Sequence, residues 1–336
     1  MSEQRRFVAV NPATITEPTA LSIGLFAYTG QGKTESSLRL AMGMRRITGR
    51  RIVFADCDNG RGLHYVRGTA TAPAMFPDVE YIDFKPPHNA LDYVALLAQY
   101  EHENAILVID NMTAEHDGEG GLLDTFEHAK QGKESRNAVA WGVAKTQHKK
   151  LLRAFPIVNR KVPIIVTWRA QEKIDWTAKD ANGKTAPQSQ GEMPIGSRDL
   201  PYEMTATYLL PAGSKGEPCL DPQEKGERLM TKIPRWFDGV IRRGEKLSEK
   251  HGEAFARWAF GDPRASSQVP PVRPAQRALE ALSKAQSIAD VDAAIDGLRG
   301  AKVSPQEKSE IKTLEASARE RLAGVVAPSD EPPITA

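Results

Sequence analysis

Ala27-Tyr-Thr-Gly-Gln-Gly-Lys-Thr34 carries the strongest structural signal in this chain of 336 residues. The apolar run 21–26 precedes it directly, and residues 35–41, which have a helical pattern, follow it. Gly30 and Gly32 allow the backbone to curl so that successive N–H groups point at phosphate oxygens, and the helix N-terminus adds a partial positive charge. Strand, turn and helix together match the P-loop pattern G-x-x-x-x-G-K-[ST], with Ala27 in place of the first glycine.

The same stretch predicts what it binds. Lys33 can reach the β- and γ-phosphates of a nucleotide, and the Thr34 hydroxyl can ligate Mg²⁺. The expected nucleotide-binding residues are Ala27, Tyr28, Thr29, Gly30, Gln31, Gly32, Lys33, Thr34 and Glu35. We therefore expect Mg²⁺ together with ATP or GTP as the ligand.

A second apolar run, residues 105–110, ends in an acid. Its continuous apolar pattern is typical of a strand buried on both faces of a parallel sheet. Asp110 would then stand at the carboxyl end of the strand, where open α/β sheets bind ligands, and its carboxylate could hold Mg²⁺ through water. The pattern predicts a metal site made by Thr34 and Asp110. The alternative is an ordinary core strand that ends in an N-cap aspartate.

Two further strand candidates end in polar residues. Residues 51–58 end in Asp56 and Asp58, which share one face while the strand continues, and one of them could deprotonate the attacking water. Residues 162–168 contain Thr167 near their end, with Arg169 next, and we predict that one of these two senses the γ-phosphate. The alternative for residues 51–58 is a polar strand end followed by a turn at 58–60, and the alternative for Thr167 and Arg169 is a strand end that faces solvent.

The order of these four segments resembles the core of RecA-type recombinases. Residues 52–58 look like the recombinase strand that carries the catalytic glutamate, so Asp58, one methylene shorter, takes its place. More closely, the chain resembles a group of phage-encoded P-loop ATPases with a minimal RecA-like core. Besides the P-loop, the matching pieces are 109–113, 141–145, 166–170, 201–204 and 234–239.

This resemblance implies an α/β fold with a RecA-like, mostly parallel sheet over residues 20–262. It implies catalytic roles for Lys33, Asp58 and Asp110, with ATP and Mg²⁺ as cofactors. Some members of the group act as ATP-dependent single-strand annealing or recombination proteins, which implies ATP hydrolysis coupled to single-stranded DNA. RecA-type sites often lie between subunits, so we expect a homo-oligomer, with Arg169 or Arg198 acting in trans.

Two segments that follow the predicted strands read as long loops. In RecA-type proteins the corresponding loops hold single-stranded DNA. Residues 111–140 begin with acidic residues, which argues against DNA contact there, and their role stays open. Residues 170–202 carry cations that could follow phosphates and an aromatic side chain that could stack on a base. The predicted DNA-binding residues are Lys173, Trp176, Lys179, Lys184 and Arg198.

Composition shifts divide the chain into five parts. We expect an N-terminal arm (1–19), the ATPase core (20–262), a proline-rich linker (263–275), a helical module (276–325) and a disordered tail (326–336). Ser304, Pro305 and Glu307 predict a helix start in the module. The module could bind a replication or recombination protein, or be an appendage without a specific ligand.

Composition also excludes several classes of protein. Two cysteines cannot form a disulfide framework or a four-ligand zinc site, and the net charge of +2 indicates no class of partner. The N-terminus lacks a secretory apolar region, and no run approaches the roughly 18 apolar residues of a spanning helix. We therefore expect a cytoplasmic protein without a membrane partner, in the bacterial host if the protein is phage-encoded.

Two other functions remain open at this stage. One is an ATPase accessory of replication, similar to a helicase loader, which acts on a protein partner through the C-terminal helices. The other is a nucleotide-binding structural protein without turnover, which Asp58 in place of glutamate makes conceivable.

Overall fold

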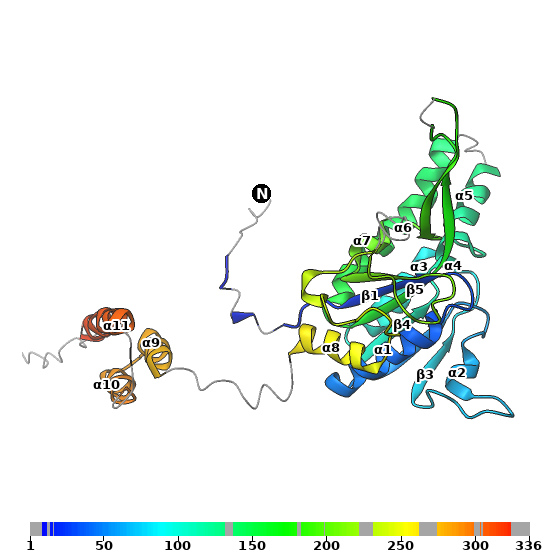
Figure 1. Cartoon of the computed structure of the whole chain (residues 1–336). Helices are drawn as coiled ribbons and strands as arrows, with labels where there is room; N and C mark the ends of the chain where they lie inside the picture. Colours follow the sequence, from blue (N-terminus) through cyan, green and yellow to red (C-terminus); the bar gives the residue numbers. More distant parts are fainter. Residues whose placement is uncertain are drawn as a thin grey trace, which may run out of the picture. The chain divides into compact units, whose positions relative to one another are not determined.

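The computed structural model describes two compact units, residues 1–262 and 263–336, each with its own hydrophobic core (Figure 1). The described residues are 9–11, 14–15, 17–131, 137–179, 183–197, 199–221, 231–261, 274–298, 303 and 305–323. Most of the predicted linker and all of the predicted C-terminal tail lie outside these ranges. The division between the units falls at the start of the proline-rich segment.

A sheet of seven strands forms the centre of the first unit. The strands are β1 (Ser22–Ala27), β2 (Arg51–Asp56), β3 (Val79–Asp83), β4 (Ala105–Asp110), β5 (Ile164–Asp175), β6 (Gln188–Pro194) and β7 (Ala206–Leu210). Their order is β3-β2-β4-β5-β1-β7, and β6 pairs with β5 outside this path. Every pairing between these strands is parallel except that of β5 with β6. The predicted α/β class with a mostly parallel sheet is therefore confirmed.

Helices cover both faces of this sheet, which explains why β1 and β4 are buried along their whole length. One face packs against α1 (Lys33–Thr48), α2 (Leu63–Arg67), η3 (Arg235–Phe237) and α8 (Glu249–Phe260). The other face packs against α3 (Ala90–Tyr100), α6 (Asn137–Asn159) and α7 (Leu200–Glu203). Within β4, Ile106 and Val108 join the first core, while Leu107 and Ile109 join the second.

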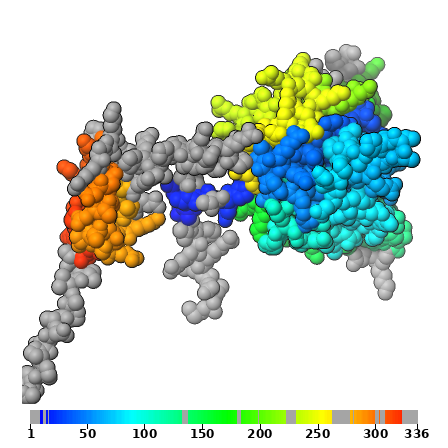
Figure 2. Space-filling view, turned by 90° about the horizontal axis from the view of Figure 1, so that it is seen from below, coloured from blue at the N-terminus to red at the C-terminus, as the bar shows by residue number. Residues whose placement is uncertain are grey.

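Helices α1 and α8 pack against each other, and Figure 2 shows them side by side. A Cβ atom at Gly43 of α1 would lie 1.9 Å from the carbonyl oxygen of Glu249, and one at Gly252 of α8 would lie 2.0 Å from that of Leu40. Only glycine fits at these two positions, because the helix backbones touch there. Helix α8 therefore fixes the position of α1, the helix that follows the glycine-rich turn.

The two predicted long loops have regular structure instead. Residues 111–140 contain α4 (Thr113–Asp117), α5 (Leu122–Gln131) and the first turn of α6, with 132–136 outside the described residues. Residues 170–202 contain the second half of β5, then β6 and α7. Strands β5 and β6 form an antiparallel hairpin that projects beyond the parallel sheet (Figure 1). Its strands are polar and largely exposed, so they lack the apolar pattern that identifies a buried strand.

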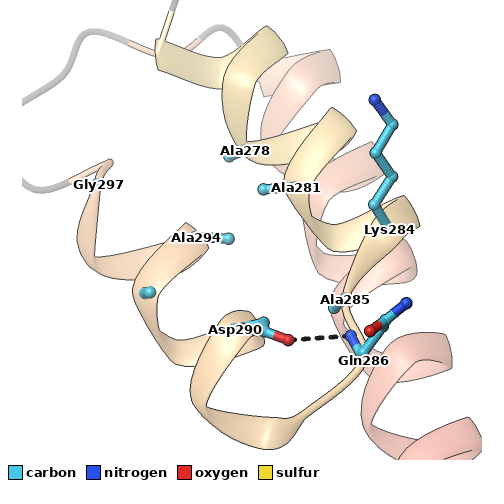
Figure 3. Close-up of a pocket in the computed structure, with 9 residues that line it drawn as sticks. Ala278, Ala281, Lys284, Ala285, Gln286, Asp290, Ala294 and Gly297 are labelled. Atoms are coloured by element: carbon cyan, nitrogen blue, oxygen red, sulfur yellow. Dashed lines mark hydrogen bonds between the residues drawn. The ribbon is translucent and has the colours of Figure 1, made fainter.

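The described residues of the second unit form three helices. They are α9 (Pro274–Lys284), α10 (Ile288–Asp296) and α11 (Pro305–Ala323). Helix α11 begins at the predicted proline, and its predicted cap, Ser304, lies outside the described residues. A groove of about 630 Å³ between α9 and α10 is lined mainly by alanines (Figure 3). At one end of the groove, the Asp290 carboxylate accepts a hydrogen bond of 3.0 Å from the Gln286 backbone N–H.

Neither unit contains a helix, within its described residues, with the length and apolar content needed to cross a membrane.

Candidate functional site

The residues predicted to bind the nucleotide and the metal, to act as base and to sense the γ-phosphate meet at the carboxyl ends of β1, β2 and β4. They also meet the middle of β5, where its parallel pairing with β1 ends. Strand β5 lies between β1 and β4, and β4 pairs with β2. The register aligns Ala27 with Arg169 and aligns Asp56 with Asp110. The four segments that sequence patterns indicated separately are thus neighbours at one edge of the sheet, where open α/β sheets bind ligands.

The glycine-rich turn, residues 27–34, has the conformation that its glycines predict. Gly30 and Gly32 have φ values of 78° and 86°, in the left-handed region. Gly32 is the N-cap of α1, and its carbonyl accepts the first helical hydrogen bond, from the N–H of Ser36 at 2.9 Å. The N–H groups in the first turn of α1 have no intrahelical partner, so they remain available to an anion.

Lys33 folds back over this turn. Its ammonium donates hydrogen bonds to the carbonyl oxygens of Ala27 at 3.0 Å and of Tyr28 at 3.1 Å. Burial lowers the pKa of Lys33, and the nearby Asp110 carboxylate opposes this shift. The ammonium therefore lies where phosphate oxygens could replace the two carbonyls as its partners.

Asp110 joins the turn to β5. Its two carboxylate oxygens accept hydrogen bonds from the hydroxyls of Thr34 and Thr167, one each, and the residue is buried. Burial raises the pKa of Asp110, while both threonine hydroxyls and Lys33 oppose the shift. The hydroxyl and carboxylate oxygens of Thr34 and Asp110 are the hard ligands that Mg²⁺ takes. No group of three or more His, Cys, Asp or Glu suited to a metal ion occurs among the described residues.

Asp56 and Asp58 differ in position and in hydrogen-bond partners, although the sequence predicted that they share one strand face. Strand β2 ends at Asp56, so the two acids do not share a strand face. Asp56 is buried and accepts hydrogen bonds from the N–H groups of Asp58 and Gly62, both at 2.8 Å, and from the Tyr81 hydroxyl at 3.1 Å. Asp56 therefore fixes the turn after β2, and its carboxylate is occupied by these contacts within the turn and with β3.

Asp58 is paired with the predicted sensor Arg169. One oxygen of its carboxylate accepts a hydrogen bond from the Arg169 guanidinium. The other oxygen lies 3.6 Å from the guanidinium of Arg61. Thr167 and Arg169 thus contact different acids, Asp110 and Asp58 respectively. The structure brings both sensor candidates into the same cluster as the predicted base and metal ligand.

Thr113 connects this cluster to the β5–β6 hairpin, and the sequence pattern gave it no role. Its hydroxyl accepts a hydrogen bond from the Arg169 N–H at 2.9 Å and donates one to the Ile195 carbonyl at 3.1 Å. The Ile195 N–H donates to the Arg169 carbonyl at 2.7 Å. These partners lie up to 82 residues apart, so only the fold reveals the contact.

The predicted DNA-binding residues lie apart from this cluster, on the hairpin. Trp176 is 67% exposed, Lys179 and Lys184 are exposed, and Lys173 is partly buried. Arg198 lies outside the described residues. Thr167 and Trp176 are nine positions apart on one continuous strand and its first turn, so they are separated by roughly 30 Å at about 3.3 Å per residue.

Asp58→Asn tests whether the acid paired with Arg169 is the general base. If Asp58 takes the proton of the attacking water, the variant is expected to lower kcat by about 100-fold or more while ATP affinity changes little. Steady-state phosphate release and equilibrium nucleotide titration measure the two quantities. Asp83→Asn is the matched control, because Asp83 ends the neighbouring strand β3 but pairs with Lys85 at 3.1 Å. Equal kcat values for the variant and the control would exclude Asp58 as the base.

No protein-family model matches this chain, and no curated protein matches it. The functional assignment therefore depends on the arrangement of Lys33, Thr34, Asp110, Thr167 and the Asp58–Arg169 pair.

Proposed function

We propose that this protein is a Mg²⁺-dependent ATPase with a RecA-like P-loop core, and that its turnover is coupled to single-stranded DNA in phage-type recombination or annealing. One observation carries the proposal. A glycine-rich turn, the lysine that follows it and the hydroxyl–carboxylate pair of Thr34 and Asp110 converge at the carboxyl edge of a parallel sheet. The position of β5 between β1, which precedes the turn, and β4, which ends in Asp110, also supports a RecA-like core.

ATP and Mg²⁺ fit these residues. The left-handed glycines form a cradle of N–H donors, and Thr34 with Asp110 supplies oxygen ligands for the metal. Bound Mg²⁺ neutralises charge on the phosphates. Lys33 would exchange the carbonyls of Ala27 and Tyr28 for phosphate oxygens.

The remaining residues of the cluster would activate the attacking water and stabilise the negative charge of the γ-phosphate. Asp58 would accept the proton of the attacking water, once Arg169 has turned from this carboxylate toward the γ-phosphate. Thr167 would report the state of the site, because its hydroxyl bonds to Asp110 and its strand continues into the hairpin. We further propose a homo-oligomeric active form, in keeping with the resemblance to RecA-type proteins.

The β5–β6 hairpin is the proposed contact for single-stranded DNA. It carries an exposed tryptophan suited to stacking on a base and lysines suited to phosphates. Thr167, Arg169 and the first arm of the hairpin all belong to β5. A movement of Thr167 or Arg169 on nucleotide binding would therefore reach the proposed DNA contact through one continuous strand. Thr113 ties that strand to the helix after β4.

Trp176→Ala is expected to weaken binding of single-stranded DNA roughly 5- to 150-fold, since base stacking contributes about 1–3 kcal/mol. Replacing Lys179 and Lys184 together by alanine is expected to lower the salt slope of binding by about 1.4, since each phosphate contact contributes about 0.7. Fluorescence anisotropy with a labelled oligonucleotide measures both quantities.

Trp236→Ala is the matched control for the tryptophan, because Trp236 is 74% exposed in the same unit but lies outside the hairpin. The DNA affinity of this control should equal that of the unmodified protein. If the two tryptophan variants bound DNA equally well, the hairpin would not be the DNA contact.

A replication accessory that acts on a protein partner is the second candidate function. The groove between α9 and α10 favours it, because the small side chains that line it would let another helix approach closely (Figure 3). In that case turnover would respond to the protein partner and not to DNA.

A further inference from the structure

The residues that would hold the metal and the γ-phosphate lie on one side of the glycine-rich turn. Asp110 and Thr167 belong to β4 and β5, and β5 is one of the two neighbours of β1. The other neighbour is β7, whose last residue, Leu210, pairs with Ala27. A nucleotide whose terminal phosphate faces β5 must therefore extend its nucleoside toward β7 or into solvent.

The segment after β7, residues 211–220, packs directly on the turn. The Gly213 N–H donates a hydrogen bond of 2.7 Å to the Gln31 side-chain oxygen. A Cβ atom at Gly32 would lie 3.3 Å from the backbone nitrogen of Gly216, and one at Gly216 would lie 3.2 Å from the Ser36 hydroxyl. This segment, here called the β7 loop, thus touches both the turn and the first turn of α1.

The β7 loop lines a partly open pocket of about 330 Å³, within the usual size of small-molecule sites. The lining is mixed: it has apolar side chains from Pro211, Ala212, Pro218 and Leu220, and charged ones from Glu217 and Arg243. The Ser214 hydroxyl also lines the pocket, is buried, and has no hydrogen-bond partner among the described residues. Apolar side chains beside a hydroxyl and two charged groups suit a base attached to a polar sugar.

The β7 loop is also bonded to the segment around Gly244 and Leu247. Glu217, which lines the pocket, accepts a hydrogen bond of 2.8 Å from the Gly244 N–H, next to Arg243 of the lining. The Gly216 carbonyl accepts another from the Leu247 N–H at 2.9 Å. The pocket is therefore built from two chain segments that are tied together and to the turn.

We infer that the β7 loop forms the nucleoside subsite, with the base of the bound nucleotide against the apolar side chains of the lining and the ribose beside its polar groups. This inference rests on the proposed nucleotide binding and assigns the part of the site that the P-loop pattern leaves undefined. It makes Ala212 and Ser214 determinants of nucleotide affinity, although neither touches a phosphate.

Inorganic tripolyphosphate separates the two halves of the site, because it carries the phosphate chain without a nucleoside. Calorimetric titration of the full chain with ATP and with tripolyphosphate, both with Mg²⁺, gives two affinities. Ala212→Trp fills the pocket from an exposed position and is expected to weaken ATP binding about tenfold or more, with tripolyphosphate affinity changed less than about twofold. Ala98→Trp, at an exposed position on α3, is the matched control and should alter neither affinity.

Unchanged ATP affinity in Ala212→Trp would overturn the nucleoside subsite while leaving the proposed function intact. An equal loss of ATP and tripolyphosphate affinity would also overturn it, because the pocket would then act only through the shape of the turn. If the unmodified protein bound neither ligand, the proposed function would fail, and the subsite with it.

Discussion

Lys33→Ala is expected to lower ATP turnover by about 10²- to 10³-fold, the loss that follows removal of one well-placed charge-stabilising donor. The Lys33 ammonium already lies over the glycine-rich turn, bonded to the carbonyl oxygens of Ala27 and Tyr28. No other lysine among the described residues donates to that turn. Phosphate release at saturating ATP and Mg²⁺ measures the loss.

Lys232→Ala is a matched control for this variant. The Lys232 ammonium also donates to two backbone carbonyls, those of Tyr202 at 3.2 Å and Met204 at 2.7 Å, but it lies beside β7 and not at the turn. Removal of either lysine takes two hydrogen bonds to backbone carbonyls from the fold, so the control shows what the loss of such contacts alone does to turnover. Only Lys33→Ala should lose turnover. Equal turnover in the two variants would remove Lys33 from the catalytic site.

Asp110→Asn is expected to lower kcat by about 100-fold or more, because the amide cannot hold Mg²⁺ as the carboxylate does. Asparagine keeps the shape of the side chain, and it can accept from one of the two threonine hydroxyls and donate to the other. The variant should therefore fold and still bind the nucleotide. Turnover measured over a range of Mg²⁺ concentrations tests the metal role, and full turnover at any of them would exclude it.

The same variant should be more stable than the unmodified protein without nucleotide at neutral pH. Burial raises the pKa of Asp110 above its unfolded value, so folding favours the protonated carboxyl group. The stability that this group contributes is fully present below the unfolded pKa and is lost as the pH rises through the folded pKa. Asparagine does not titrate, so the gain in melting temperature should be largest at neutral pH and shrink in acid. A lower melting temperature at neutral pH would contradict this reasoning.

The strands that sequence patterns predicted are those buried on both faces. Strands β1, β2 and β4 and the first half of β5 are continuous apolar runs, which few other structures require. Strand β3 has no such run, because it lies at the edge of the sheet and only its first residue, Val79, is buried. The hairpin strands are mostly polar and have only a few buried residues, such as Ala170 and Met193, so residues 170–202 lack the apolar run that predicts a strand. A strand could therefore be predicted where burial on both faces requires a continuous apolar run, and the intrinsic strand propensity of its residues mattered less.

The site was predictable to the extent that it follows from strand ends. Thr34, Asp110 and Thr167 were expected at one edge because the carboxyl ends of parallel strands meet there, and the structure joins them directly. The division of roles between Asp56 and Asp58 depends on the residue at which β2 ends, and element ends are poorly defined by sequence patterns. Contacts such as Gln31 with Gly213, 182 residues apart, leave no local signal at all.

ATP hydrolysis with Mg²⁺, measured with and without single-stranded DNA and with Lys33→Ala as the blank, tests the central claim most directly. The account predicts turnover above the blank that rises when DNA is added, and a smaller rise in Trp176→Ala than in Trp236→Ala. Turnover that ignores DNA would contradict the coupling and favour the protein-partner function. Turnover no greater than that of the blank, with or without DNA, would contradict the assignment as an ATPase.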